Sequence, residues 1–178
     1  MKFIIKNKGQ IWVETVIYTL IGLALIGLVL AILTPKIKEF RDRTVIEDTL
    51  SLMNVFDSKI NEVLDAPGNK RKIEMTIDKG TLSIDPQKDA FFFVLDGAHV
   101  RYSEPGVSLD IGRVNVTTDI AGENYKITLE THYVHNITFD GSDESVKEFT
   151  AVSLPYKVFV ENRGISDGRY VIDFTEGN

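Results

Sequence analysis

The hydrophobic positions of the chain fall into three zones, and the first is an uninterrupted apolar segment near the N-terminus. From Thr15 to Pro35 there are 21 residues without a charged side chain. An α-helix rises about 1.5 Å per residue, so a helix of this length crosses the roughly 30 Å hydrocarbon core of a bilayer. The pattern therefore predicts a helix of transmembrane character over residues 10–35.

Helical periodicity resumes beyond Pro35 and defines the second zone. Apolar and small side chains recur at spacings of three, four and one residues and form one stripe: Val45, Thr49, Leu52, Met53, Phe56, Ile60, Val63 and Leu64. The helix-breaking sequence Asp65-Ala66-Pro67-Gly68-Asn69 follows. We therefore expect one long helix over residues 11–65 with a kink at Pro35 and an amphipathic extension over residues 36–66. Two helices joined at Pro35 are the alternative.

The third zone, residues 67–178, alternates apolar with polar positions between turn sequences, which predicts short strands. The segment from Tyr125 to Tyr133 alternates most clearly. The apolar run Phe91–Leu95 is interpreted as a strand buried on both faces, Asp96-Gly97 as a hairpin turn and Gly112-Arg113 as a bulge. About eight to ten strands predict an antiparallel β-sandwich, and an immunoglobulin-like sandwich is one arrangement that fits. The expected fold class is α+β, a long N-terminal α-helix followed by this sandwich.

The charges are distributed unevenly along this pattern. The 178 residues include 26 acidic and 20 basic side chains, for a formal charge of −6, and no cysteine. Without cysteine the chain has no disulfide scaffold, thiolate nucleophile or Cys-ligated metal centre. Its acidic balance argues against a general nucleic-acid binder, and its charged fraction of 26% excludes a multi-pass membrane protein. Basic residues precede the apolar segment, and most of the acidic excess lies beyond residue 65.

Three interpretations compete for the apolar segment. A secretory signal peptide has a shorter apolar region followed by a small-x-small cleavage site, and this chain has neither. A plain single-span anchor fits the length. The third interpretation depends on the preceding residues, which read Lys8-Gly9-Gln10-Ile11-Trp12-Val13-Glu14. A carboxylate at the start of an apolar helix is costly unless it is paired or neutralised, so Glu14 points to a function that a plain anchor lacks.

These residues resemble the class III signal peptides of archaeal type IV pilin-like proteins, a family that includes archaellins and adhesion pilins. The family pattern is a basic leader that ends in Gly or Ala, cleavage on the cytoplasmic side, and Glu at the fifth mature position. The resemblance implies that residues 1–9 are a cleavable leader and that Lys8, Gly9 and Gln10 form the peptidase processing site. Gln10 would then be the first mature residue and Glu14 the fifth.

The resemblance also implies how the chain would assemble. The amine that cleavage creates at Gln10 would pair with Glu14 of a neighbouring subunit, which offsets the cost of burying that carboxylate and fixes the axial register. Glu14 is also expected in the first turn of its helix, where the helix dipole favours negative charge. Pro35, the expected kink, is the third residue assigned to assembly. Trp12 and Tyr18 depart from the family, in which Ser and Leu are common at these positions.

The implied function is that of a structural subunit of an archaeal type IV pilus-like surface filament. Its partners would be other copies of itself, a prepilin peptidase, an assembly ATPase and a membrane platform protein. Before assembly the chain would be a single-pass membrane protein with its C-terminus outside, and afterwards part of an extracellular filament, for example in cell adhesion. The alternative is an uncleaved, single-span membrane-anchored binding module of the cell envelope, similar to stator-like accessory proteins of the archaellum, or a minor pilin.

Two Asn-x-Thr sequons lie in the β-region, at Asn115 and Asn136. Alternation places Asn115 opposite Val114 and Val116, and it places Asn136 on the polar side of the strand that contains Tyr125. Both asparagines are therefore expected to face solvent, as N-glycosylation requires, and they are the candidate glycosylation sites of a glycoprotein.

The sequence offers little for catalysis. His132 and His135 are three residues apart on an expected strand and so point to opposite faces, which makes a poor metal pair. The acidic run Asp140–Glu144 lacks the spacing of an EF-hand loop. No G-x-S-x-G, P-loop or H-E-x-x-H motif occurs. We therefore expect no enzymatic activity, no cofactor, no metal site and no nucleic-acid partner.

Overall fold

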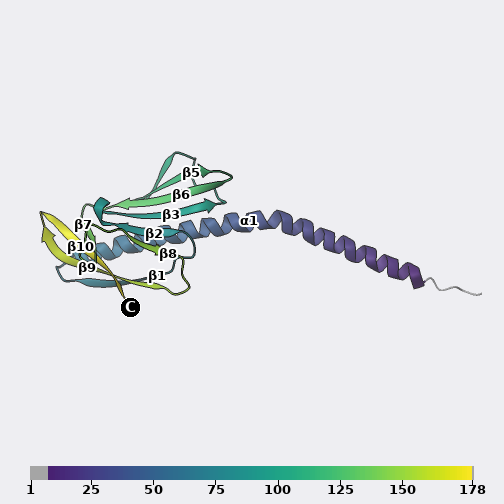
Figure 1. Cartoon of the computed structure of the whole chain (residues 1–178), viewed down its shortest axis with the longest axis horizontal. Coiled ribbons are helices and arrows are strands. Elements are labelled where there is room, and N and C mark those ends of the chain that lie inside the picture. Colours follow the sequence, from purple (N-terminus) through teal and green to yellow (C-terminus); the bar gives the residue numbers. More distant parts are fainter. Residues whose placement is uncertain (1–7, 178) are drawn as a thin grey trace, which may run out of the picture. The chain divides into compact units, whose positions relative to one another are not determined.

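The computed structural model describes residues 8–177, with side chains from residue 12 onward. One long helix is followed by short strands and a single 3₁₀ turn (Figure 1). The bounds of these elements are α1 Lys8–Leu64, β1 Lys70–Met75, β2 Thr81–Asp85, η1 Pro86–Lys88, β3 Ala90–Ala98, β4 Ser108–Ile111, β5 Val114–Ala121, β6 Asn124–His132, β7 Asn136–Phe139, β8 Lys147–Thr150, β9 Tyr156–Ser166 and β10 Arg169–Gly177. The α+β class expected from the sequence is confirmed.

The chain divides into two compact units, Met1–Glu39 and Phe40–Asn178. Helix α1 contributes to both units, and Pro35 lies inside it without ending it. Proline is tolerated there although it has no N–H to donate to the carbonyl of Ala31. The alternative of two separate helices joined at Pro35 is therefore wrong.

The strands form two sheets in the second unit. The four-stranded sheet has the order β1-β9-β10-β7, and the six-stranded sheet has the order β4-β5-β6-β3-β2-β8. Among the described residues every strand pair is antiparallel except one, because β7 runs parallel to β10 with Asn136 opposite Val171. This strand order and the parallel pair differ from an immunoglobulin-like sandwich, whose sheets are antiparallel.

The second half of α1 packs against both sheets and forms part of the core. Its buried stripe consists of Asp42, Ile46, Thr49, Leu50, Met53, Phe56, Ile60 and Val63. The ring centroid of Phe56 lies 5.1 Å from that of Phe91 in β3 and 6.0 Å from that of Phe174 in β10. Phe91 and Phe174 also contact each other directly, at 5.2 Å. The helix therefore supplies a central element that both sheets share.

Strand β3 differs from the sequence-based expectation of a strand buried on both faces. Phe91, Phe93 and Leu95 are fully buried, whereas Phe92 and Val94 are only half-buried. Phe92 has a partial cover, since the Lys88 ammonium lies 5.0 Å from the centroid of its ring.

The two turn signals of this sheet have exchanged roles. Asp96-Gly97 lies within β3, where the pairing with β6 shifts between Leu95 and Ala98, so it forms a bulge and not a hairpin turn. Gly112-Arg113 joins β4 to β5 and so forms the hairpin turn rather than a bulge. Both glycines have a positive φ, 67° and 65°, which a bulge and a turn accept equally.

Candidate functional site

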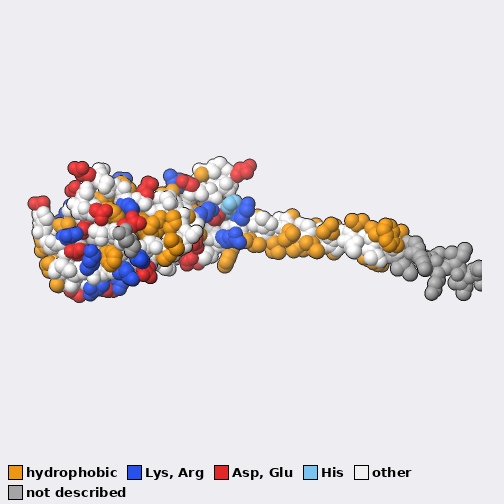
Figure 2. Space-filling view, turned by 60° about the horizontal axis from the view of Figure 1, so that its bottom comes forward, with side chains coloured by type: hydrophobic (Ala, Val, Ile, Leu, Met, Phe, Trp, Pro, Cys, Tyr) orange, Lys and Arg blue, Asp and Glu red, His pale blue; other side chains and the backbone are white. Residues whose placement is uncertain are grey.

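The first candidate site is the apolar half of α1, from Trp12 to Leu33. Every residue in it is exposed except Gly22, which is half-buried. Trp12 and Tyr18 are each 71% exposed. Figure 2 shows this part of the helix as an almost continuous apolar surface. The helix is long and apolar enough to span a membrane, so the sequence-based prediction of a membrane-compatible segment is confirmed at that level.

Two hydroxyl groups in and beside this segment are satisfied by the helix itself. Thr19 Oγ1 donates to the carbonyl oxygens of Thr15 and Val16, at 3.0 and 2.8 Å. Thr34 Oγ1 donates to the carbonyl oxygen of Leu30 at 2.7 Å. In hydrocarbon an unsatisfied polar group is expensive, so these internal bonds make the segment compatible with an apolar environment.

The predicted processing and assembly residues lie at the start of this helix. The backbone of Lys8, Gly9 and Gln10 forms its first turn, while their side chains and the leader residues 1–7 lie outside the described part of the chain. Glu14 is exposed and lies in the second turn, and no acidic residue lies in the first turn. The expectation of a first-turn Glu14 is therefore wrong for the uncleaved chain, because the helix begins before Gly9. Pro35 is exposed within the helix.

A second candidate site is a polar cluster in the second unit around Asp42 of α1. Its carboxylate is 4% exposed and accepts a hydrogen bond from the backbone N–H of His99 at 2.7 Å. The Lys79 ammonium donates to the same carboxylate at 2.5 Å, and Nδ1 of His99 lies 3.0 Å from it. Lys79 lies on the connection from β1 to β2, which joins the two sheets, and His99 follows β3, so one buried acid ties the helix to both connections.

These contacts decide the ionisation of Asp42. Burial alone would raise the pKa of its carboxyl group, because it penalises the charged form. The backbone hydrogen bond from His99 and the contacts with the side chains of Lys79 and His99 outweigh burial and lower the pKa. Asp42 is therefore a paired, ionised structural carboxylate and not a proton donor.

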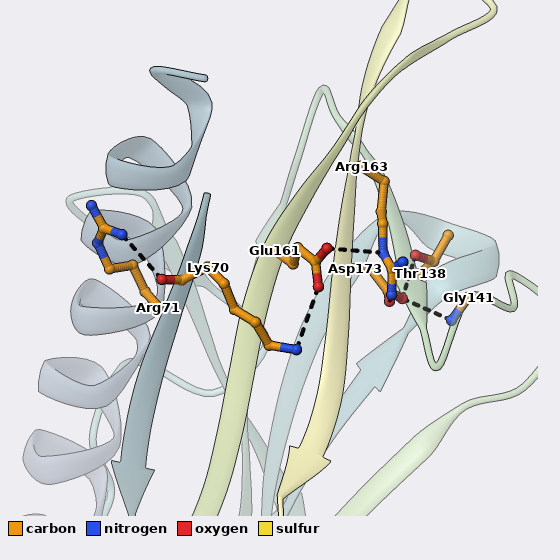
Figure 3. Close-up of polar contacts among 7 residues, drawn as sticks. All are labelled: Lys70, Arg71, Thr138, Gly141, Glu161, Arg163 and Asp173. Carbon is orange, nitrogen blue, oxygen red and sulfur yellow. Dashed lines mark hydrogen bonds and ion pairs between the residues drawn. The ribbon is translucent and has the colours of Figure 1, made fainter. Parts of the chain in front are cut away.

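A third candidate site centres on Asp173 of β10, in the four-stranded sheet (Figure 3). This fully buried carboxylate accepts hydrogen bonds from Thr138 Oγ1 at 2.7 Å and from the Gly141 N–H at 2.8 Å, and it pairs with the Arg163 guanidinium at 2.9 Å. Arg163 also lies 3.7 Å from Glu161. The hydrogen bond to Asp173 raises the pKa of Arg163. Because each partner comes from a different connection or strand, the cluster joins β7, β9 and β10.

A cavity of about 290 Å³ opens between α1 and the connection from β1 to β2. Leu52, Met75 and Phe93 line its apolar interior, and Asp48 and Asp78 add acidic groups. Glu74 and Lys79 also line it, so the cavity carries charges of both signs. Among the described residues, no group of three or more His, Asp or Glu side chains is placed to hold a metal ion.

The two neighbouring histidines are not on one strand. His132 ends β6, and its ring centroid lies 6.0 Å from that of Phe92. His135 precedes β7, and its ring centroid lies 5.8 Å from that of Tyr170. Burial, and then the nearby Arg113 charge, lower the pKa of His135, which favours the neutral imidazole. The expectation that both lie on one strand is wrong, because the chain changes sheets between β6 and β7.

The first sequon lies on β5 near the edge of the six-stranded sheet. Asn115 is half-buried, and its side-chain amide donates to Ser108 Oγ and, at 2.9 Å, to Asp110 Oδ1 of β4. The side-chain oxygen Oδ1 of Asn115 accepts a hydrogen bond from Thr117 Oγ1 at 3.5 Å. The side chain is less open than alternation predicted, and a glycan attached in the folded chain would replace one amide hydrogen and so remove at least one of the two bonds that the amide donates.

The second sequon lies in a different sheet from the one that the sequence indicated. Asn136 is the first residue of β7, in the four-stranded sheet, and it is half-buried. The parity argument fails because it counted alternation from the strand of the other sheet. Thr138, the third residue of this sequon, is buried and donates to Asp173, so in the folded chain its hydroxyl is already in use.

Sequence analysis missed the acids at the centre of the two polar clusters. Asp42 precedes Ile46 by four residues, so its position on the buried helical stripe was a readable signal. Apolar periodicity alone does not reveal Asp42, because its side chain is charged. Asp173 gave no such signal, since it lies inside the strand sequence Tyr170–Phe174 and its partners come from distant parts of the chain.

Comparisons of the chain with protein-family models, with curated proteins and with solved structures found no match. The expected resemblance to pilin-like proteins therefore depends on the sequence alone, on the residues from Lys8 to Glu14 and the apolar segment that follows them.

Proposed function

We propose that this chain is a structural subunit of an archaeal type IV pilus-like surface filament that polymerises through its N-terminal helix. The observation that carries the proposal is that the two halves of α1 differ in burial. From Asp42 to Val63 one stripe of the helix is buried in the second unit, whereas from Trp12 to Leu33 apolar side chains are exposed on all sides. A helix that is apolar all round is found buried in a membrane or in a protein core, and no described part of this chain covers it.

Two environments would cover this segment in succession. Before assembly the hydrocarbon of a membrane would surround it, with the second unit outside the cell. After assembly the same surface would pack against the helices of other copies. The lipid already keeps the segment away from water, so the transfer into the filament would be driven by van der Waals packing between helices and not by the hydrophobic effect.

Small residues within the segment support close packing between helices. A Cβ atom added to Gly22 or Gly27 would meet no heavy atom within 4 Å, so both positions are open to an approaching helix. Gly27 and Ala31 form a small-xxx-small pair. Such pairs are enriched where membrane helices contact each other.

The charge of Glu14 would select the axial register of the filament. Between Gly9 and Pro35 the sequence contains no other charged residue. After cleavage the Gln10 amine of a neighbouring subunit would pair with this carboxylate, whereas a wrong register would leave Glu14 in an apolar environment. The processing enzyme would be a prepilin peptidase, and an assembly ATPase with a membrane platform protein would drive polymerisation.

The N-terminus of the native protein tests this proposal. We expect the mature chain to begin at Gln10, because peptidase cleavage follows Gly9, and to be recovered in filaments visible by electron microscopy. Intact-mass measurement of the wild type and of Gly9→Val should show processing in the first and an uncleaved chain without filaments in the second. Gly9→Ala is the matched control and should be processed, since the family pattern accepts Gly or Ala.

A native chain that still begins at Met1 would contradict the filament proposal. That result, with the chain retained in the membrane, would favour the alternative of an uncleaved anchor that presents the β-sheets as a binding module. Cleaved chain present only in trace amounts within a filament of another protein would instead identify a minor pilin.

A further inference from the structure

The two Asn-x-Thr sequons differ in how the fold uses the asparagine side chain. The amide group of Asn115 donates hydrogen bonds to Ser108 Oγ and to Asp110 Oδ1 of β4. Asn136 is half-buried at the start of the edge strand β7, and within residues 12–177 its side-chain amide has no hydrogen-bond partner. A sugar on the amide of Asn136 would therefore displace no hydrogen bond of the fold, whereas a sugar on Asn115 would remove at least one.

The third residue of the Asn136 sequon is closed in the folded chain. Thr138 is 6% exposed, and its hydroxyl donates to the buried carboxylate of Asp173 at 2.7 Å. Only Ser or Thr serves at this position of a sequon, so the hydroxyl is part of what a glycosylating enzyme recognises. The backbone N–H of Ile137 is also in use, because it donates to Asp89 Oδ1 at 2.9 Å. An enzyme therefore cannot engage this sequon while β7 lies in its sheet.

The strand that closes the Asn136 sequon comes last in the chain. Among the described strands, β7 pairs only with β10, and Val171, the residue opposite Asn136, lies 35 positions further along the sequence. Asp173, which accepts the hydrogen bond from Thr138, belongs to the same strand. A chain that crosses a membrane from its N-terminus onward therefore exposes Asn136 and Thr138 before the residues that bury them arrive.

The surroundings of Asn115 are complete earlier. Its strand β5 pairs with β4 and β6, and these three strands lie within residues 108–132. Strand β3, which pairs with β6, and the buried half of α1 precede them. A β-hairpin forms in about 1–10 μs, whereas synthesis adds about 5–20 residues per second. The strands around Asn115 can therefore pair before Asn136 appears, which leaves that sequon a shorter time in an open state.

We propose that Asn136 carries an N-linked glycan that is attached while the chain crosses the membrane, before β10 pairs with β7, and that Asn136 is modified in preference to Asn115. The donor is a lipid-linked oligosaccharide activated by a phosphate at its anomeric carbon. A bond forms between Asn136 Nδ2 and that carbon, and the bond from the carbon to the phosphate oxygen breaks. The lipid phosphate leaves with the electron pair, and one amide proton passes to a base.

The inference rests on one part of the proposed function, the placement of the second unit outside the cell. It needs neither cleavage after Gly9 nor filament formation. Every contact on which it depends lies within the second unit.

Occupancy of the two sequons in the native protein is the first test. Mass spectrometry of peptides would quantify the glycan at each site, and we expect several-fold higher occupancy at Asn136 than at Asn115. Thr138→Val should abolish the glycan at Asn136, whereas Thr138→Ser should keep it because Ser also supplies the hydroxyl. Thr117→Val removes the other sequon and should leave occupancy at Asn136 unchanged.

The time of attachment requires a second measurement in the same cells. Chains would be synthesised in heavy-isotope medium with the gene for the glycosylating enzyme switched off, and then in light medium with the gene switched on. We expect the light chains to be modified at Asn136 and the heavy chains to stay unmodified, because they are already folded. Limited proteolysis would verify that the heavy chains are folded.

A variant that opens the sequon completes the second measurement. In Asp173→Ala the Thr138 hydroxyl loses its acceptor and β10 is held less firmly, so heavy chains should gain the glycan at Asn136 whether the variant folds loosely or fails to fold. Asp143→Ala is the matched control, since Asp143 is exposed in the loop that follows β7, and its heavy chains should stay unmodified.

Several outcomes would overturn the inference. Occupancy at Asn136 no higher than at Asn115 would do so, as would heavy wild-type chains modified as fully as light ones, or heavy Asp173→Ala chains that gain no glycan. An unmodified Asn136 in a second unit that external protease can reach would refute the inference alone. A second unit that stays inside the cell would refute it together with the proposed function, whereas a glycosylated chain that still begins at Met1 would support the inference and refute the filament.

Discussion

At the scale of single residues, Asp42 shows how one buried carboxylate organises the second unit. It is nearly inaccessible, yet every hydrogen bond that it accepts comes from outside its own helix. A buried charge without partners is costly, so the carboxylate is stable only when Lys79 and His99 are in place. The position therefore couples helix placement to the connection between the two sheets and to the connection that follows β3.

We expect Asp42→Asn to lower the free energy of unfolding of the second unit by about 1–3 kcal/mol, because charge-assisted hydrogen bonds are replaced by weaker ones and Lys79 loses its counter-ion. Chemical denaturation of the full chain in detergent, followed by circular dichroism, would measure it. Glu47→Gln is the control, since Glu47 is exposed on the same helix and its change should be near zero.

The pH dependence of this effect has a definite sign. The pKa of Asp42 is lowered in the folded state, so its stabilisation is complete above the ordinary carboxyl value of about 3.9 and is lost as the pH falls through the folded pKa. The stability difference between wild type and Asp42→Asn should therefore be constant above about pH 5 and shrink below about pH 4. A constant difference down to pH 2 would show that Asp42 acts without its charge.

At the scale of elements, α1 is the feature on which both sheets depend. The Phe56 ring contacts Phe91 of the six-stranded sheet and Phe174 of the four-stranded sheet, and those two rings also contact each other. A cavity at this point would remove packing from all three elements at once. Helix and sheets are therefore expected to unfold together.

We expect Phe56→Ala to lower the free energy of unfolding by about 3–5 kcal/mol, the usual loss for a buried phenylalanine whose site cannot collapse. Thermal or chemical denaturation would measure it. Val55→Ala on the same helix is the control; Val55 is 43% exposed, so its change should stay within about 0.5 kcal/mol. Equal losses for the two variants would mean that the helix is not part of the core.

The elements also show what the sequence could and could not predict. The helix and most strands followed from periodicity, because the apolar positions on one element are neighbours in the chain. The parallel pairing of β7 with β10 could not follow, since it joins Asn136 to Val171 across 35 positions of sequence. The exchanged roles of Asp96-Gly97 and Gly112-Arg113 could not follow either, because both glycines adopt the same positive φ and only the partner strand distinguishes the two cases.

At the scale of the whole molecule, the candidate assembly site could be predicted because its residues are neighbours in the sequence and need no tertiary contact to be recognised. The uncharged segment and Glu14 can be read directly from the sequence. The Asp42 and Asp173 clusters could be found only in the structure, since their members are separated by 37 and 57 residues in one case and by 35 residues in the other. Local patterns thus predicted the apolar helix, whose role in assembly stays a prediction, and tertiary structure defined the polar clusters.

In the proposed assembly, Glu14 acts through its contact with a neighbouring copy and not within the single chain. We expect Glu14→Gln to leave processing at Gly9 intact and to abolish or greatly reduce filaments, because the Gln10 amine loses its ionic partner in the neighbouring copy. Intact mass and electron microscopy would be measured together. Glu123→Gln, in the exposed turn between β5 and β6, removes the same charge and should assemble normally. Wild-type filament yield from Glu14→Gln would exclude this pairing as the source of register.

The burial of α1 between two sheets has a mechanical consequence. A pull along the helix would load the second unit in shear, because the stripe from Asp42 to Val63 is held along about 32 Å of helix rather than at one end. Extraction would have to break the Asp42 contacts and the contacts of the Phe56 ring with both sheets, which lie along the same stretch of helix. The two β-sheets would thus resist tension along the buried part of the helix as one body.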